Sequence, residues 1–339
     1  MRALRAVGPG GQNVRLCEIP EKGELAAGEV VVATRAVGVC GSDIHAWHGT
    51  QSYPMTYPVT LGHEAVGTVE RVAPGVDTVV PGTRVVSETA RSVCGRCAAC
   101  REGRYNLCPH RLGFGALYDG AMADAFVTRA DLLHTVPDAI SDEVAAVTEP
   151  YCVAYNAVVE RARVRPGDVV AVIGPGPVGV FAAEISLLAG ASEVLVAGVP
   201  GDEPRLNLAS AIGCETSLSD GNWWEKAGLP GSSDVVIDSS GVSATLEAAL
   251  TLARPGGQVV KVGWGPQPYG RPLDLLVSKA VELHGSFSHT WSTWERVLRL
   301  LGKERLRPAG ALRVYEFADW RAAFSEMADR TVLKAVMTL

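Results

Sequence analysis

The sequence predicts an α/β protein in two parts, a mostly-β region up to about residue 150 and a doubly wound parallel sheet after it. In the first part, glycines and prolines separate short apolar runs, as between antiparallel strands. From Asp168 onward, near-continuous apolar strands alternate with helical stretches, which is typical of a parallel sheet covered on both faces. A length of 339 residues is enough for two domains.

The first part is expected to form short strands that are punctuated by turn residues. These strands are predicted at Met1–Ala6, Val14–Cys17, Glu29–Ala33, Glu64–Val72 and Thr83–Glu88. The C-terminal tail VLKAVMTL resembles this β region more than the α/β region, so we expect it to return to the first domain. We therefore place a first domain at residues 1–152 and 289–339, and a second domain at residues 153–288.

The second part alternates strands and helices. The strand DVVAVI is followed by the helix VFAAEISLLAG, the strand SEVLVAGV, the helix RLNLASAIG, the strand SDVVIDSSG, the helix ATLEAALTLARPGG and the strand QVVKVGW. A last strand at Glu282–Phe287 should end this sheet, and a helix is expected in TWERVLRLLGK.

The bulk composition excludes several classes of partner. The formal net charge is −6 and no block of lysines and arginines occurs, so neither nucleic acid nor an anionic membrane is an expected partner. No stretch of about 18 apolar residues is present, and the N-terminus lacks an apolar signal core. We therefore expect a cytoplasmic protein whose partner is a small molecule. Eight cysteines are too few for a disulfide scaffold in a chain of this length, and the clustering of four of them indicates metal binding rather than disulfides.

Four cysteines fall within one short loop, in the spacing C-x2-C-x2-C-x7-C. They are Cys94, Cys97, Cys100 and Cys108. Four thiolates can surround a tetrahedral Zn²⁺ with Zn–S bonds of about 2.3 Å, which leaves no open position and makes the metal structural. An iron–sulfur cluster is the competing interpretation, but no proline follows Cys100 and nothing else in the chain suggests electron transfer.

A second set of possible metal ligands is dispersed over three turns. Cys40 lies in GVCGSDIH, His63 and Glu64 lie in LGHEAVG, and Glu149 lies in VTEPYCV. One thiolate, one imidazole and a carboxylate suit a Zn²⁺ ion that keeps a position open for water or substrate. Because adjacent strand residues point to opposite faces, a turn or bulge at Gly62 must aim both His63 and Glu64 if both bind. We rank Cys40 and His63 first, with Glu64 and Glu149 either as direct ligands or as outer groups that orient the metal-bound water.

A glycine fingerprint marks the dinucleotide site. Gly174, Gly176 and Gly179 form G-x-G-x-x-G between a strand and a helix, and Pro177 and Val178 complete the turn. The pyrophosphate of a bound dinucleotide is expected at the N-terminus of that helix, where free N–H groups favour negative charge.

The next strand departs from the pattern expected for NAD. An acidic residue should end this strand and bind the ribose, but Gly198 stands there instead. Arg205 follows in the next helix and is a candidate for binding a 2′-phosphate, although it is equally compatible with a helix surface position. The coenzyme is therefore predicted as NAD or NADP, with a slight preference for NADP being accepted.

Taken together, these motifs resemble those of the zinc-containing medium-chain dehydrogenase/reductase family, nearer its sorbitol and threonine dehydrogenase branch than the vertebrate-type alcohol dehydrogenases. The resemblance covers essentially the whole chain and rests on GVCGSDIH, GHEAVGTVERVAPGV, the four-cysteine loop, the TEP turn and GPGPVG. It implies a GroES-like mostly-β catalytic domain and a Rossmann domain, with the active site between them. It also implies a homodimer or homotetramer.

The resemblance also implies roles for individual residues. Cys40, His63 and either Glu64 or Glu149 would hold the catalytic zinc, and the four-cysteine loop would hold the structural one. Ser42 and His45 match the proton-relay positions. The implied activity is hydride transfer between a secondary alcohol, of polyol or amino-polyol type, and NAD(P). A ketone reductase working in the opposite direction and a non-catalytic NADPH-binding protein are the alternatives.

Several further residues have two interpretations each. Asp43 either tunes the relay or caps a helix. Ser286, Ser288 and His289 end the last strand and either contact the nicotinamide or substrate or cap the turn. His110, His134 and His284 have no partner motif and are interpreted as structural.

Overall fold

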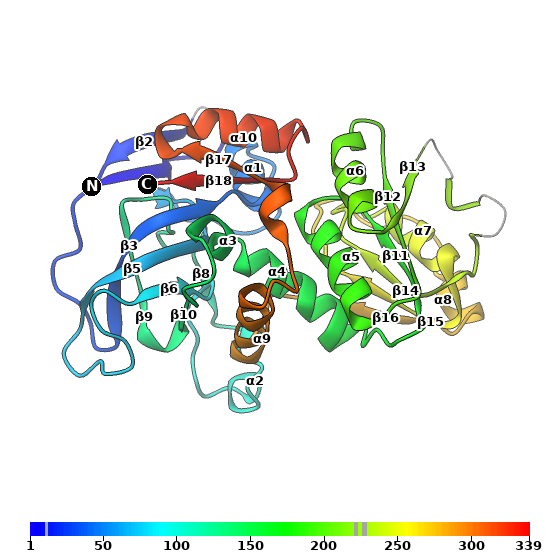
Figure 1. Ribbon diagram of the computed structural model, residues 1–339, viewed down its shortest axis with the longest axis horizontal. Helices are drawn as coiled ribbons and strands as arrows, with labels where there is room; N and C mark the ends of the chain where they lie inside the picture. The colour runs from blue at the N-terminus through cyan, green and yellow to red at the C-terminus, as the bar shows by residue number, and fades with distance from the viewer. Residues whose placement is uncertain (11–12, 220–222, 226–228) are drawn as a thin grey trace. The chain divides into compact units, whose positions relative to one another are not determined.

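The computed structural model describes residues 1–10, 13–219, 223–225 and 229–339. Its internal contacts divide the chain into two compact units (Figure 1). Unit 1 comprises Met1–Glu149, His289–Ala328 and Lys334–Leu339, and unit 2 comprises Pro150–Ser288 and Asp329–Leu333. Among the described residues, no helix is long and apolar enough to cross a membrane.

Unit 1 is built around a seven-stranded sheet. Its strands run in the order β10-β6-β5-β3-β18-β17, and β9 also pairs with β3. Their bounds are β3 Glu29–Gly38, β5 Glu64–Val72, β6 Arg84–Ser87, β9 Ala125–Arg129, β10 Leu133–Thr135, β17 Leu312–Glu316 and β18 Lys334–Thr338. The tail strand β18 pairs antiparallel with β3, with Val336 opposite Gly38. The C-terminal tail therefore returns to the sheet of unit 1, as its sequence predicted.

Smaller elements surround this sheet. A three-stranded sheet has the order β2-β1-β4 and a two-stranded one pairs β7 with β8. Their bounds are β1 Arg2–Ala6, β2 Val14–Glu18, β4 Val59–Thr60, β7 Ala90–Ser92 and β8 Leu112–Gly113. The helices of unit 1 are α1 Gly41–His48, α2 Ala98–Arg101, α3 Asp142–Ala146, α9 Trp291–Gly302 and α10 Trp320–Ala328, and α4 Thr148–Tyr155 begins in it.

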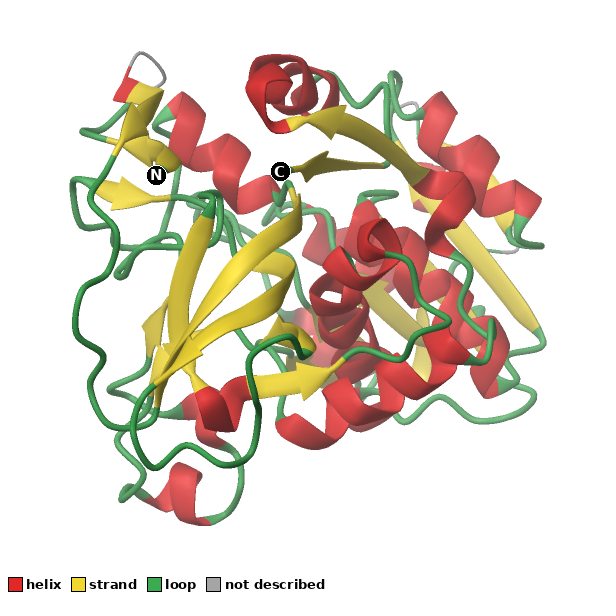
Figure 2. Ribbon diagram, turned by 60° about the vertical axis from the view of Figure 1, so that its left-hand side comes forward, coloured by secondary structure: helices red, strands yellow, loops and turns green. Residues whose placement is uncertain are grey.

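Unit 2 contains a six-stranded sheet in which every strand pair is parallel, with the order β13-β12-β11-β14-β15-β16. The strands are β11 Val169–Ile173, β12 Glu193–Gly198, β13 Glu215–Leu218, β14 Ser233–Asp238, β15 Ala253–Lys261 and β16 Glu282–Gly285. The helices α5 Pro177–Ala189, α6 Glu203–Ala211, α7 Thr245–Leu252 and α8 Asp274–Ser278 connect them, as labelled in Figure 1. Figure 2 shows the helices and strands of the chain in contrasting colours. Central strand residues such as Val172, Val236 and Ile237 are fully buried, which explains their near-continuous apolar sequence.

The α/β fold class with a mostly-β part and a doubly wound parallel sheet is confirmed. In the β part the strand pairs are antiparallel, except for the parallel pair β17–β18, and one element of unit 2 differs from its prediction. The helix expected through ATLEAALTLARPGG stops at Leu252, and β15 already begins at Ala253. Pro255 cannot donate the backbone hydrogen bond that a longer helix needs, and the residue before it favours extended backbone. The ARPGG segment therefore belongs to the strand.

The glycine fingerprint explains how β11 passes into α5. Gly174 has φ +96°, and a Cβ there would lie 2.8 Å from Ser240 Cα. A Cβ on Gly179 would lie 2.0 Å from the Gly174 carbonyl oxygen, so the helix can approach the strand only without a side chain at this position. Gly176 is the N-cap of α5 with φ −67°, and a Cβ there would meet nothing within 4 Å.

These contacts predict that only one of two alanine substitutions lowers the melting temperature. Gly179→Ala should lower the melting temperature by several degrees, because its methyl group pushes α5 off β11 at a cost of about 1–3 kcal/mol. Gly176→Ala is the matched control and should leave the melting temperature of the ligand-free protein unchanged. Calorimetry measures both, and equal melting temperatures would contradict the close approach.

Candidate functional site

The first ligand turn lies between β3 and α1 in unit 1. Cys40 is the N-cap of α1 with extended backbone, and its backbone conformation marks the end of β3 and the start of the helix. Asp43, three residues into the motif, accepts a hydrogen bond from the Cys40 backbone N–H at 2.9 Å. Asp43 was predicted either to tune the relay or to cap a helix, and this hydrogen bond is the geometry of a helix cap.

The second ligand turn precedes β5. Gly62 has φ +87°, and a Cβ there would lie 2.5 Å from Met122 Cγ, so only glycine fits this turn. His63 lies just before β5 and Glu64 is its first residue. The change of direction aims both side chains at Cys40, and the three ligand atoms lie within 4.8 Å of one another.

Asp43 also joins the two turns to each other. Its carboxylate accepts one hydrogen bond from Cys40 N and another from Gly62 N at 3.2 Å. The side chain is 2 % exposed, and burial raises its pKa. One buried carboxylate thus fixes the separation between the Cys40 and His63 turns.

The donor set fits a zinc ion. A thiolate, an imidazole and a carboxylate are the ligand types that Zn²⁺ takes in sites that keep a position for a reactant. Although burial acts to lower it, the pKa of His63 is raised well above its usual range by the negative charges of Cys40, Asp43 and Glu149. This concentration of negative charge around one imidazole is the environment that a divalent cation would neutralise.

Lys334 was not identified from the sequence, although it lies directly beside this cluster. Its ammonium forms an ion pair with Glu64 and donates to the Val39 carbonyl at 2.7 Å, and both charged side chains are about 1 % exposed. Burial raises the pKa of Glu64, and Lys334 acts in the opposite direction. The only signal in the sequence was a charged residue at the start of the apolar tail strand β18.

Glu149 lies near the cluster but is not one of the three converging ligands. It is buried, and its Oε1 lies 3.3 Å from Nε2 of His289. Burial would raise its pKa, but hydrogen bonding by His289 and the nearby His63 lower it. Glu149 is therefore positioned as an ionised neighbour of the metal ligands.

The proposed relay residues lie on α1, three residues apart. Residues at this spacing share one face of a helix, so Ser42 and His45 are neighbours there. Nδ1 of His45 lies 2.9 Å from the Thr50 hydroxyl, and burial together with His48 lowers the pKa of His45. The Tyr53 hydroxyl donates to the Ser42 carbonyl at 2.7 Å, which fixes the following loop on the helix.

The four-cysteine loop gathers all its sulfur atoms. Cys94, Cys97, Cys100 and Cys108 have ligand atoms within 4.8 Å of one another. Backbone N–H groups point at the sulfurs, with Cys94 N 3.3 Å from the Cys108 sulfur and Cys97 N 3.4 Å from the Cys94 sulfur. The backbone N–H groups of Arg96 and Cys97 lower the pKa of Cys94 to about 6, which favours the thiolate that a metal needs.

In unit 2, the N-terminus of α5 lies at the carboxyl end of β11. Pro177 and Val178 form its first turn after Gly176, so the predicted turn residues are together at one helix end. This helix has 13 residues and no acidic residue in its first turn. Its free N–H groups and dipole suit a phosphate.

The carboxyl end of β12 has an acidic residue beside it, although Gly198 itself carries no side chain. A side chain on Gly198 would meet Pro175 Cγ at 2.9 Å and Asp202 Cβ at 3.0 Å, so Asp202 fills the space beside it. Asp202 Oδ2 accepts from Val199 N at 3.0 Å, and its Oδ1 lies 3.3 Å from Arg330. Arg330, from the segment before β18, is thus a cation at this loop that the sequence did not indicate.

Arg205 has a structural contact. It is 7 % exposed, and its Nε donates to the Val332 carbonyl at 3.1 Å. Burial lowers its pKa to about 10. It is therefore not the helix surface residue considered as the alternative, and its assignment to the coenzyme remains a prediction.

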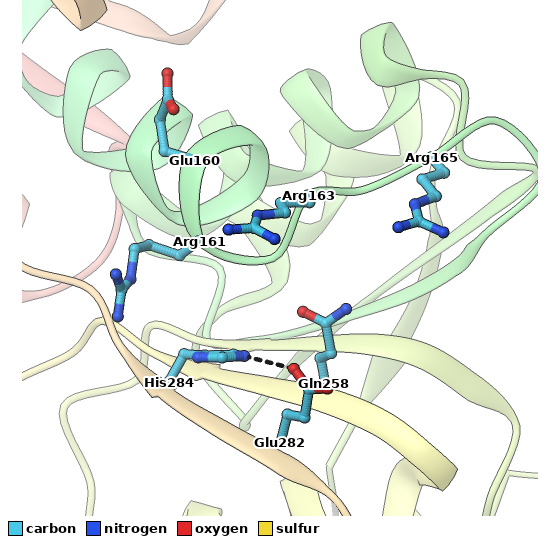
Figure 3. Close-up of a pocket in the computed structure, with 7 residues that line it drawn as sticks. All are labelled: Glu160, Arg161, Arg163, Arg165, Gln258, Glu282 and His284. Atoms are coloured by element: carbon cyan, nitrogen blue, oxygen red, sulfur yellow. Dashed lines mark hydrogen bonds and ion pairs between the residues drawn. The ribbon is translucent and has the colours of Figure 1, made fainter.

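The last strand of unit 2 leads into a turn held by Asn156. Its amide donates to Ser286 Oγ at 3.1 Å and to the Ser288 carbonyl at 2.9 Å, so these serines stabilise the turn. A separate cavity of about 230 Å³ lies beside β16 and contains none of the predicted site residues (Figure 3). It is lined by Glu160, Arg161, Arg163, Arg165, Gln258, Glu282 and His284. His284 pairs there with Glu282 at 3.1 Å.

Each half of the chain matches a known domain family. Residues 26–138 match the alcohol dehydrogenase GroES-like domain, and residues 177–303 match the zinc-binding dehydrogenase domain. The chain is 33% identical to the sorbitol dehydrogenase of Halalkalibacterium halodurans, over 94% of this chain and 95% of that protein. It is 30% identical to the D-arabitol-phosphate dehydrogenase of Enterococcus avium, over 99% of this chain and 97% of that protein.

A solved structure supports the same relationship. The alcohol dehydrogenase TADH from Thermus sp. ATN1 superimposes with a TM-score of 0.89 at 29% identity, and the match covers 100% of this chain and 99% of that one. From the ligand clusters, the glycine fingerprint and these full-length similarities, we conclude that the chain belongs to the zinc-containing medium-chain dehydrogenase/reductase family, in its sorbitol-dehydrogenase-like branch.

Proposed function

We propose that the protein oxidises a secondary hydroxyl group of a polyol, or of a related amino-polyol, with NAD or NADP as the hydride acceptor. The observation that carries the proposal is the convergence of Cys40, His63 and Glu64 from two turns. Polyol substrates are supported by the sorbitol and D-arabitol-phosphate dehydrogenases among the relatives. The same site catalyses reduction of the corresponding ketone in the reverse direction.

Each group of the site has a role in this reaction. Cys40, His63 and Glu64 would hold a zinc ion, which supplies Lewis acidity to the alcohol oxygen when bound. Lys334 would hold Glu64 through an ion pair, and Asp43 would hold the His63 turn through Gly62 N. Glu149 contributes negative charge near His63. The four-cysteine loop would hold the structural zinc.

The hydroxyl proton must leave before the hydride can be transferred. We assign its route to Ser42 and then His45, which share one face of α1. The lowered pKa of His45 keeps its imidazole neutral at pH 7, so that it can accept the proton. Thr50, bound to Nδ1 of His45, would orient the ring during the transfer.

Unit 2 would bind the coenzyme. The glycine turn leaves open space at Gly176 for the pyrophosphate to approach the backbone of α5. Asp202 and Arg330 pair at the end of β12, where the adenosine ribose of a dinucleotide is recognised. This strand end thus offers an acid for the ribose hydroxyls and a cation for a 2′-phosphate, which supports NAD or NADP as the coenzyme.

We also propose a homo-oligomer in the cytoplasm. The strand β16 lies at the edge of its sheet and exposes Leu283, and such an edge invites pairing with a second copy. No two of the described cysteines form a disulfide, which is compatible with a reducing compartment. Light scattering of the purified protein measures the oligomeric state.

The function is tested by separating turnover from coenzyme binding. The zinc-loaded enzyme should reduce NAD⁺ or NADP⁺ with at least one member of a panel of polyols, polyol phosphates, amino-polyols and threonine. Cys40→Ser should lose turnover by about a hundredfold or more, because the ligand set loses its thiolate. Coenzyme binding, followed by the fluorescence of the reduced coenzyme, should be unchanged because the glycine turn is in unit 2.

The control is Cys17→Ser, which removes a thiol outside both clusters. It should keep both zinc ions and full turnover. Near-normal turnover of Cys40→Ser would contradict the proposal. So would a parent enzyme that binds two zinc ions but oxidises no member of the substrate panel.

The relay predicts a pH dependence. Because the pKa of His45 is lowered, kcat for alcohol oxidation should fall only below pH 6.5, where the imidazole becomes protonated and can no longer accept the proton. His45→Gln should remove this limb and lower kcat roughly tenfold to a hundredfold at neutral pH. His48→Gln should keep the limb and move it upward, since the positive charge of His48 contributes to the lowered pKa. A pH–rate profile of His45→Gln that matches the parent enzyme would exclude this relay.

A further inference from the structure

The segment after β16 brings His289 into contact with the site carboxylate Glu149. His289 is 2 % exposed and begins the return of the chain to unit 1. Its Nε2 lies 3.3 Å from Glu149 Oε1 and its Nδ1 lies 2.6 Å from Nε1 of Trp294. Both ring nitrogens of one buried imidazole are thus engaged by buried groups.

The partner on Nδ1 determines which nitrogen carries the proton. An indole Nε1–H can only donate, so Nδ1 of His289 must accept. The ring proton of the neutral imidazole is therefore on Nε2, and it points at the Glu149 carboxylate. With the tautomer fixed in this way, His289 is an obligatory donor to Glu149.

The surrounding residues hold this pair rigidly. Trp294 is 1 % exposed and packs edge-on against His289, with ring centroids 5.0 Å apart. The Thr89 hydroxyl lies 3.5 Å from His289 Nε2 and accepts from Arg111 at 2.7 Å. Arg111 follows the last cysteine of the four-cysteine loop and donates its backbone N–H to Cys108 O at 3.0 Å.

A second connection reaches the same segment from within the loop. The Tyr105 hydroxyl donates to the buried carboxylate of Glu88 at 2.6 Å and accepts from Trp291 N at 2.5 Å. Glu88 Oε1 lies 3.4 Å from Nε2 of His134, whose other nitrogen contacts Glu295 at 2.7 Å. The start of α9 is therefore bonded directly to the four-cysteine loop at Tyr105 and is connected to the end of that loop through Thr89 and Arg111.

We propose that His289 is a positioning residue for Glu149, that Trp294 fixes its tautomer, and that the four-cysteine loop sets the position of both. The inference rests on the proposed function, because it treats Glu149 as part of the catalytic metal site. It gives the structural metal loop a role in the geometry of that site. Outer partners of this kind typically change metal affinity or activity about 10–100-fold when they are lost.

The decisive variant is Trp294→Phe, which keeps an aromatic ring but removes the indole donor. Zinc release from the Cys40 site to a chelator should become about tenfold faster or more, and kcat should fall while KM for the coenzyme is unchanged. With Co²⁺ in place of zinc, the visible absorption bands of the Cys40 site should shift. The zinc of the four-cysteine loop should be retained.

Two controls separate positioning from general destabilisation. Trp291→Phe changes a neighbouring, exposed indole whose hydrogen bond to Tyr105 uses only its backbone N–H. Its ring centroid lies 3.9 Å from that of the His134 ring, a contact that phenylalanine keeps, so this variant should behave as the parent enzyme. At His289 itself, Gln keeps an N–H donor and should retain more activity and slower zinc release than Leu. Tyr105→Phe should change zinc release in the same direction as Trp294→Phe.

The inference is overturned if Trp294→Phe matches Trp291→Phe in zinc release, cobalt spectrum and kcat, or if His289→Gln and His289→Leu are equivalent. Zinc release and the cobalt spectrum need no substrate. An enzyme inactive on the whole alcohol panel would therefore contradict the proposed function while these two measurements still decide the role of His289.

Discussion

The site depends on one constraint, which is that a thiolate, an imidazole and a carboxylate from two separate turns must meet around one point. The backbone accomplishes this with Gly62, whose positive φ turns two adjacent side chains toward Cys40. The buried Asp43 carboxylate then holds both turns through their N–H groups. Desolvating that carboxylate is unfavourable, and its two hydrogen bonds offset the cost only while the turns stay together. The geometry of the ligands and the folding of this region are consequently linked.

Most of the fold was predictable because its signals are local. Apolar periodicity and glycine or proline punctuation identified β1, β2, β5 and the alternation of unit 2. The glycine fingerprint was equally readable, since each of its glycines has a separate steric reason within one turn. The exception, ARPGG, shows the limit of periodicity, because a helical pattern continued into a segment where Pro255 enforces extended backbone.

The site was predictable only where its residues lie in a motif. Glycine-bordered turns made it possible to identify Cys40, His63, Glu64 and the four loop cysteines from the sequence. Lys334 and His289 could not be identified in this way, because they reach unit 1 from the far end of the chain and their importance arises from contacts made only after folding. His134 is buried and hydrogen-bonded, which agrees with its interpretation as a structural residue. For His289 the sequence suggested a turn cap or a ligand contact, but not its contacts with Glu149 and Trp294.

The end of β12 shows why a missing residue must be interpreted in three dimensions. In the sequence, Gly198 suggested that the acidic group expected near the ribose was absent. In the structure, Asp202 lies against Gly198, so an acidic group is present at that strand end but comes from the following loop. Arg330 neutralises part of this charge from a segment more than a hundred residues away in the sequence. This strand end therefore carries the acid Asp202 and the cation Arg330, and the neighbouring Glu203 carboxylate accepts from Gly201 N at 2.8 Å. An acid introduced at position 198 would collide with Asp202 rather than fill a vacant position.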